Sequence, residues 1–139
     1  MNYKELMYKE NYYIDLIEVK AVNTNGSLGI ILKGCENETD LLISKGVDMI
    51  HLIFPSYATY SVTFEDFEYH APEEIFDGTA FRIYKYSSLL EHLKRKTNLE
   101  QQQLGRKKIY QHYSLSYMEH HLDIVSFDIP SVRFEKFAG

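Results

Sequence analysis

The sequence predicts an α+β domain, in which a mainly antiparallel, curved sheet or partial barrel is covered by one main helical segment, about 88–104. In the run Tyr60–Glu65, large residues alternate with polar ones, which is typical of a strand with one buried face. Strand-like segments dominate both halves of the chain. They do not alternate regularly with helices, which argues against a parallel doubly wound sheet.

The first third of the chain predicts a short helix followed by strands. Tyr3, Leu6 and Met7 have helical spacing within 1–10. In the segment Tyr12–Val22, the β-branched and aromatic content favours a strand, although a helix would also bring apolar residues to one side, so both readings stay open. The following segments are expected to be a turn at 23–26, a strand at 28–33, a polar loop at 34–40 and an extended segment at 41–44.

The middle of the chain predicts three strands and an acidic loop. Asp48–Phe54 is apolar at almost every position, which is typical of a strand covered on both faces, and Pro55 ends it. The remaining segments are a strand at 57–67, a loop at 68–78 and a strand at 79–86.

Helix signals are clearest after residue 87. Ser88 and Glu91 have the spacing of a capping box, and Leu89, Leu90 and Leu93 form an apolar stripe. A second capping pattern, at 97–100, either breaks this helix or lies within it. The rest of the chain predicts strands at 107–118 and 122–127, a turn near 119–120 between them, and a last edge strand, Val132–Phe137, which could recruit a second copy into a homo-oligomer.

Composition limits the classes of protein. The 139 residues suit one domain, and the net charge of −5 argues against a free nucleic-acid binder, which needs positive charge to neutralise phosphates. A single cysteine, Cys35, allows no internal disulfide and suits a reducing compartment. The sequence shows neither a signal peptide nor about 20 consecutive apolar residues. We therefore expect a cytoplasmic protein that does not enter a membrane.

Acidic residues are concentrated in one short window that contains no Lys or Arg. Such a window can steer and hold a basic protein partner, or it can be a solvated loop. Catalysis by paired carboxylates would need burial, which this polar segment does not offer. The candidate partner-binding residues are Glu65, Asp66, Glu68, Glu73, Glu74 and Asp77.

A second cluster contains histidines and one aspartate: His112, His120, His121 and Asp123. On a straight strand, His121 and Asp123 would share one face, while His112 and His120 would share the other. The four side chains would not converge, and the sharper spacing of a zinc site is missing. No metal or other cofactor is therefore predicted, and these residues are expected to be structural. Nor is there a Gly-x-Ser-x-Gly elbow to indicate a catalytic residue.

The C-terminal half resembles small uncharacterised bacterial proteins, some of which neighbour toxin genes. The matching stretches are Phe81-Arg82-Ile83-Tyr84, Tyr110-Gln111-His112-Tyr113 and His121-Leu122-Asp123-Ile124-Val125-Ser126. The resemblance implies a non-enzymatic protein–protein interaction domain of the immunity type. Two alternatives remain open: a small-ligand-binding domain whose aromatic-lined pocket is closed by the helical segment, and a metal-dependent enzyme.

Overall fold

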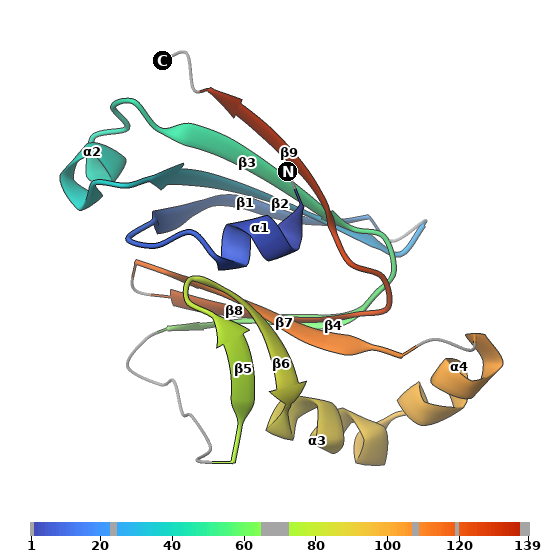
Figure 1. Ribbon diagram of the computed structural model, residues 1–139. Coiled ribbons are helices and arrows are strands. Elements are labelled where there is room, and N and C mark those ends of the chain that lie inside the picture. Colours follow the sequence, from blue (N-terminus) through green and yellow to red (C-terminus); the bar gives the residue numbers. More distant parts are fainter. Residues whose placement is uncertain (1, 23–24, 65–72, 107–108, 119, 137–139) are drawn as a thin grey trace.

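Two antiparallel sheets face each other in the computed structural model, which describes residues 2–22, 25–64, 73–106, 109–118 and 120–136 (Figure 1). Sheet A has the strand order β1-β2-β3-β9, and sheet B has the order β4-β8-β7-β6-β5. The strands of sheet A are β1 (Tyr13–Val22), β2 (Ser27–Cys35), β3 (Asp48–Phe54) and β9 (Ser131–Lys136). Those of sheet B are β4 (Tyr57–Phe64), β5 (Ile75–Gly78), β6 (Phe81–Tyr86), β7 (Gln111–Tyr117) and β8 (His120–Ser126).

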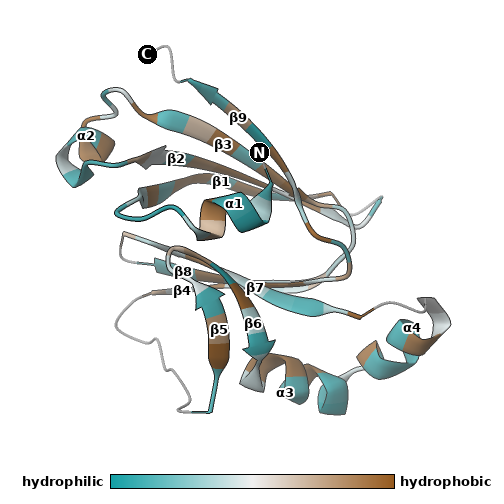
Figure 2. Ribbon diagram, viewed as in Figure 1, coloured by the Kyte–Doolittle hydropathy of each residue, from teal (hydrophilic) through white to brown (hydrophobic). Residues whose placement is uncertain are grey.

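Short helices lie around the two sheets: α1 (Tyr3–Met7), α2 (Glu38–Leu42), α3 (Ser88–Lys96) and α4 (Leu99–Arg106). In Figure 2, α3 and α4 carry both hydrophobic and hydrophilic positions, as is usual for helices that turn one side to a protein core. No described helix is long and apolar enough to cross a membrane.

The main core lies between the inner faces of the two sheets. Ile30, Leu52 and Phe54 of sheet A meet Tyr113 and Leu122 of sheet B, and each is at most 1% exposed. These side chains come from alternate positions of their strands. The alternation of apolar and polar residues in the sequence therefore gives each sheet one buried face.

The helix α1 lies between the sheets and anchors there through Tyr3 (Figure 1). The Tyr3 ring makes edge contacts with Phe81 and Tyr113, at centroid distances of 5.9 and 5.3 Å. Its hydroxyl lies 2.9 Å from the carbonyl oxygen of Arg82 and 3.1 Å from that of Ser114, and it accepts a hydrogen bond from the Arg82 N–H. A buried hydroxyl thus joins the backbones of β6 and β7.

A second, smaller core forms where α3 and α4 pack on the outer face of sheet B. It contains Leu99, Tyr110, Val125 and Phe127, with Leu89, Leu90 and Leu93 packed against it. By contrast, none of the described helices covers the outer face of sheet A (Figure 1).

The predicted mainly antiparallel architecture is confirmed, but the number of sheets and the helical segment differ from the prediction. Two facing sheets replace the expected single curved sheet or partial barrel. The helical segment is divided at Thr97, whose backbone is extended, and its hydroxyl donates to the carbonyl of Leu93. The cap of α3 is Ser87, which accepts from the N–H of Leu90, so the assignment of the cap to Ser88 was wrong.

Several local expectations are settled. The segment at 12–22 is a strand, β1. The predicted loop and extended segment at 34–44 instead contain α2, which Asn37 caps by accepting from the N–H of Asp40. Part of the predicted acidic loop is the strand β5, and residues 65–72 lie outside the described ranges. The predicted last edge strand is confirmed as β9 at the margin of sheet A.

Two expectations about burial were wrong, each for its own reason. In β3, Ile53 is 49% exposed, because the outer face of sheet A has no cover, so the strand is buried on one face only. In β4, Tyr60 and Val62 pair with the buried Ile124 and Leu122, which places them on the predicted inner face. They are nevertheless 37% and 48% exposed, because β4 is an edge strand with a neighbour on one side only.

Candidate functional site

The uncovered outer face of sheet A is built from regular rows of side chains. The strand register places one residue of each strand in a row, with side chains on the same side of the sheet. One row is Lys20, Gly29, Ile53 and Ser131. The next row is Glu18, Ile31, His51 and Arg133.

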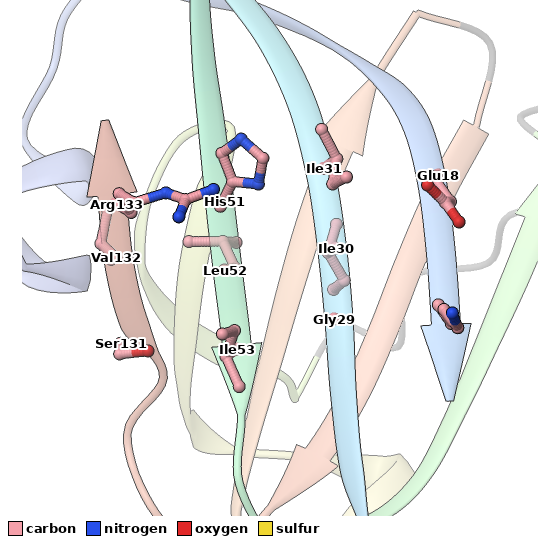
Figure 3. Close-up of a pocket in the computed structure, with 11 residues that line it drawn as sticks. Glu18, Gly29, Ile30, Ile31, His51, Leu52, Ile53, Ser131, Val132 and Arg133 are labelled. Atoms are coloured by element: carbon pink, nitrogen blue, oxygen red, sulfur yellow. The ribbon is translucent and has the colours of Figure 1, made fainter. Parts of the chain in front are cut away.

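A groove of about 500 Å³ runs over these two rows (Figure 3). Its floor is Gly29, which has no side chain, and Ile31 and Ile53 flank that position. A Cβ atom added at Gly29 would meet only the carbonyl oxygen of Lys20, at 3.8 Å, so the space above this glycine is open. The missing side chain therefore makes a hollow in an otherwise continuous sheet face.

Charged side chains border this groove on both margins. Glu18 and Lys20 lie on β1, Arg133 lies on β9, and all three are exposed. Next to Arg133, Nε2 of His51 lies 3.0 Å from Oε1 of Glu135. The groove can therefore receive an apolar side chain while its margins meet groups of opposite charge.

The outer face of sheet B carries a different arrangement, a buried polar network. A single oxygen, Oδ1 of Asp123, lies 2.7 Å from Nε2 of His112 and 3.0 Å from Nε2 of His121. Beyond each imidazole stands a serine: Ser87 Oγ is 2.7 Å from Nδ1 of His112, and Ser116 Oγ is 3.0 Å from Nδ1 of His121. An ionised carboxylate only accepts, so Nε2 of each imidazole donates to Asp123, and this leaves Nδ1 as the atom that faces the serine hydroxyl.

Strand register explains why these residues meet. In the β7–β8 ladder, Ser114 pairs with Asp123 and Ser116 pairs with His121, so His112 lies on the same face two residues further along. His112 also stacks on the ring of Tyr84, at a centroid distance of 3.9 Å and an interplanar angle of 6°. Its side chain is 3% exposed. Stacking and hydrogen bonds together fix the ring orientation.

The charge of Asp123 is stabilised by its neighbours. Burial alone would raise the pKa of the carboxyl group, but hydrogen bonds from His112 and His121 outweigh burial and hold the pKa well below its usual range. The network therefore keeps a carboxylate ionised in a largely buried place.

The predicted separation of the histidines is half right. His120 lies apart from the network, stacked on Tyr117 and in edge contact with Phe64. His112 joins His121 and Asp123, contrary to expectation, because the chain reverses between β7 and β8 and pairs even-numbered residues with odd-numbered ones. Within the described residues, no group of three or more His, Cys, Asp or Glu side chains is arranged to hold a metal ion.

Sequence reasoning missed Ser87 and Ser116 as partners of the histidines. Ser116 meets His121 through the β7–β8 pairing, whereas Ser87 lies outside this ladder, at the cap of α3, so local sequence patterns indicate neither contact.

The acidic window contributes no compact site among the described residues. Glu65, Asp66 and Glu68 lie outside the described ranges. Of the others, Glu73 is exposed, Glu74 is partly buried, and Oδ2 of Asp77 lies 3.4 Å from Nζ of Lys85.

Comparisons with known proteins found no matching family model, no matching curated protein and no matching solved structure.

Proposed function

We propose that this protein is a protein–protein interaction domain of the immunity type, and that it binds a protein partner through the outer face of sheet A. The observation that carries the proposal is the groove over Gly29 in a sheet face that no described helix covers. Large exposed apolar side chains beside such a hollow are typical of interaction surfaces.

The groove exposes a large apolar side chain, since Ile53, which lines it, is 49% exposed. Burying such side chains stabilises a complex by about 25 cal/mol per Å² of apolar surface removed from water, before the costs of association.

The charged margins specify the partner's chemistry. Within the described part of the chain, neither Arg133 nor Glu18 has an ion-pair partner. A fitting partner presents an apolar side chain to Gly29, with an acidic group toward Arg133 and a basic group toward Glu18. Such complementarity sets the orientation and the rate of association more than the affinity.

The acidic window supports a separate proposal, namely that its residues bind a basic protein partner. Asp77 belongs to β5 of sheet B, and Glu73 lies just before that strand. A partner steered by them would contact a different part of the molecule from the groove.

The groove can be tested by filling it. Peptides are selected from a random display library against the immobilised protein, and their affinities are measured by calorimetry. Gly29→Leu places a side chain in the hollow, where a Cβ atom would meet only the carbonyl oxygen of Lys20, at 3.8 Å. We expect Gly29→Leu to weaken binding at least about tenfold, which corresponds to about 1.4 kcal/mol.

Gly105→Leu is the matched control, because it makes the same chemical change on α4, where nothing lies within 4 Å. It should bind the peptides as the wild type does. Equal affinity of Gly29→Leu and the wild type would contradict the proposal. Sedimentation at increasing concentration tests whether the partner is a second copy of the chain.

A further inference from the structure

A cleft of about 660 Å³ lies where α1, β6, α3 and the start of β7 meet, and it is separate from the groove of sheet A. Its lining includes Ser87, Tyr84, Tyr86 and Tyr110. Ser87 is the residue at which the buried polar network reaches this cleft. Aromatic side chains line the cleft, which borders the helix α3.

We propose that Ser87 is the nucleophile of an acyl-transfer site in this cleft, with His112 as its general base and Asp123 as the residue that orients His112. The chain of contacts is continuous: Ser87 Oγ to His112 Nδ1 is 2.7 Å, and His112 Nε2 to Asp123 Oδ1 is 2.7 Å. A nucleophile, a base and an orienting carboxylate at these distances form the arrangement of serine hydrolases. The activity is independent of the partner binding proposed for sheet A.

The assignment of nitrogens is the reverse of the usual triad. Here the carboxylate is bonded to Nε2 and the serine to Nδ1. Either imidazole nitrogen can accept a proton when the other one donates to a carboxylate. Proton transfer therefore requires only that the serine contact one ring nitrogen and the carboxylate the other. The second donor to Asp123, His121, is a positioning residue that holds the carboxylate in place.

Helix capping alone does not explain the arrangement. A cap requires only that Ser87 Oγ accept from the N–H of Leu90, a contact of 3.0 Å. A helix cap does not require the buried imidazole of His112 and the carboxylate of Asp123, which continue the chain of contacts beyond that oxygen. The cap also places Oγ at the positive end of a nine-residue helix, where developing negative charge is stabilised.

The reaction would proceed in two steps, acylation of Ser87 and hydrolysis of the acyl-serine. Ser87 Oγ attacks the carbonyl carbon of an ester, its proton moves to Nδ1 of His112, and the C–O bond to the alcohol breaks as that proton passes to the leaving oxygen. Water then attacks the acyl carbon and loses a proton to Nδ1 of His112, and the bond between the acyl carbon and Oγ breaks as that proton passes to Oγ, which releases the carboxylic acid and restores Ser87.

The residues that line the cleft indicate which acyl group the substrate would carry. Tyr84, Tyr86 and Tyr110 supply aromatic surface for a flat or apolar acyl chain. Two of the three lysines that line the cleft are paired: Nζ of Lys85 lies 3.4 Å from Oδ2 of Asp77, and Nζ of Lys94 lies 3.5 Å from Oε1 of Glu91. Because of the aromatic side chains, a carboxylic ester of an aromatic acid is the substrate class that fits this cleft.

A fluorophosphonate reagent tests the nucleophile directly on the full wild-type chain. Attack by Oγ forms an O–P bond and expels fluoride, which adds a defined mass. We expect one adduct per chain, mapped by peptide mass spectrometry to Ser87. Either the absence of an adduct on the folded protein or an adduct confined to another residue would overturn the proposal.

Variants then assign the roles. Ser88→Ala removes the neighbouring hydroxyl and should be labelled at the wild-type rate. His112→Gln should slow labelling at least about a hundredfold, as expected for loss of a general base. Ser87→Gly keeps most of the cap, and it should abolish both labelling and turnover of 4-nitrophenyl benzoate. Unchanged rates in a folded His112→Gln or Ser87→Gly variant would contradict these assignments.

Discussion

Nε2 of His112 lies 2.7 Å from Oδ1 of Asp123, and this contact joins β7 to β8 on the face of sheet B that carries the helices. Through Ser87 it continues to the N-terminus of α3, and through His121 it continues to Ser116. One largely buried carboxylate thus links a covering helix to the strands β7 and β8, so its substitution should affect stability as well as the proposed chemistry.

Asp123→Asn should destabilise the protein markedly. The substitution keeps the shape but removes the charge that accepts from two imidazoles, and hydrogen bonds to a charged group contribute about 1.5–3 kcal/mol. We expect the free energy of unfolding, measured in urea, to fall by that amount. Asp77→Asn is the control: its exposed pair with Lys85 should contribute about 1 kcal/mol or less, and a larger loss there than at Asp123 would contradict the account.

Lowering the pH should remove the contribution of Asp123. Its folded-state pKa lies below the ordinary value of 3.8, so the ionised carboxylate stabilises the fold above about pH 4 and loses this effect as the pH falls further. The difference in unfolding free energy between wild type and Asp123→Asn should therefore shrink between about pH 5 and pH 3. A difference that grows over this range would contradict the network geometry.

Two glycines of β2 should respond oppositely to alanine. A Cβ at Gly34 would collide with the ring of Tyr12, whose hydroxyl donates to Oδ2 of Asp48 at 3.0 Å. Gly34→Ala should lower the free energy of unfolding by about 1–3 kcal/mol, as overpacking does. Gly29→Ala enters open space and should raise it by about 0.5–1 kcal/mol, because glycine weakens a strand.

Thermal denaturation of the two variants checks this pair. Equal effects at Gly29 and Gly34 would show that the hollow above Gly29 is closed in solution.

Tyr3→Phe isolates the hydroxyl that bridges β6 and β7. The ring contacts with Phe81 and Tyr113 remain, but the buried N–H of Arg82 loses its acceptor. We expect a loss of about 1–3 kcal/mol in urea denaturation. Tyr8→Phe makes the same change just beyond α1 on a side chain that is 74% exposed, and it should change stability by less than about 0.5 kcal/mol.

Much of the strand content could be predicted because each strand has its own local pattern. The apolar run that became β3 and the terminal strand β9 are examples, and the prolines before and after them helped to mark the boundaries. The division into two sheets could not be predicted, since nothing in the alternation of Tyr60, Val62 and Phe64 tells which strands will lie beside β4.

The candidate sites depended on pairing even more strongly. His112 and Asp123 are eleven residues apart, and only the β7–β8 register brings them together. Gly29 lies within a predicted strand and carries no signal of its own, yet its importance comes from Ile53 beside it on β3. Local sequence patterns contain neither of these relationships.

The most direct test of the proposed binding face is a map of amide chemical-shift changes on adding a selected peptide to the isotope-labelled protein. Our account predicts the largest changes at Ile31, Ile53 and Arg133, with no saturable change at the same sites in Gly29→Leu. Changes confined to the outer face of sheet B would contradict it.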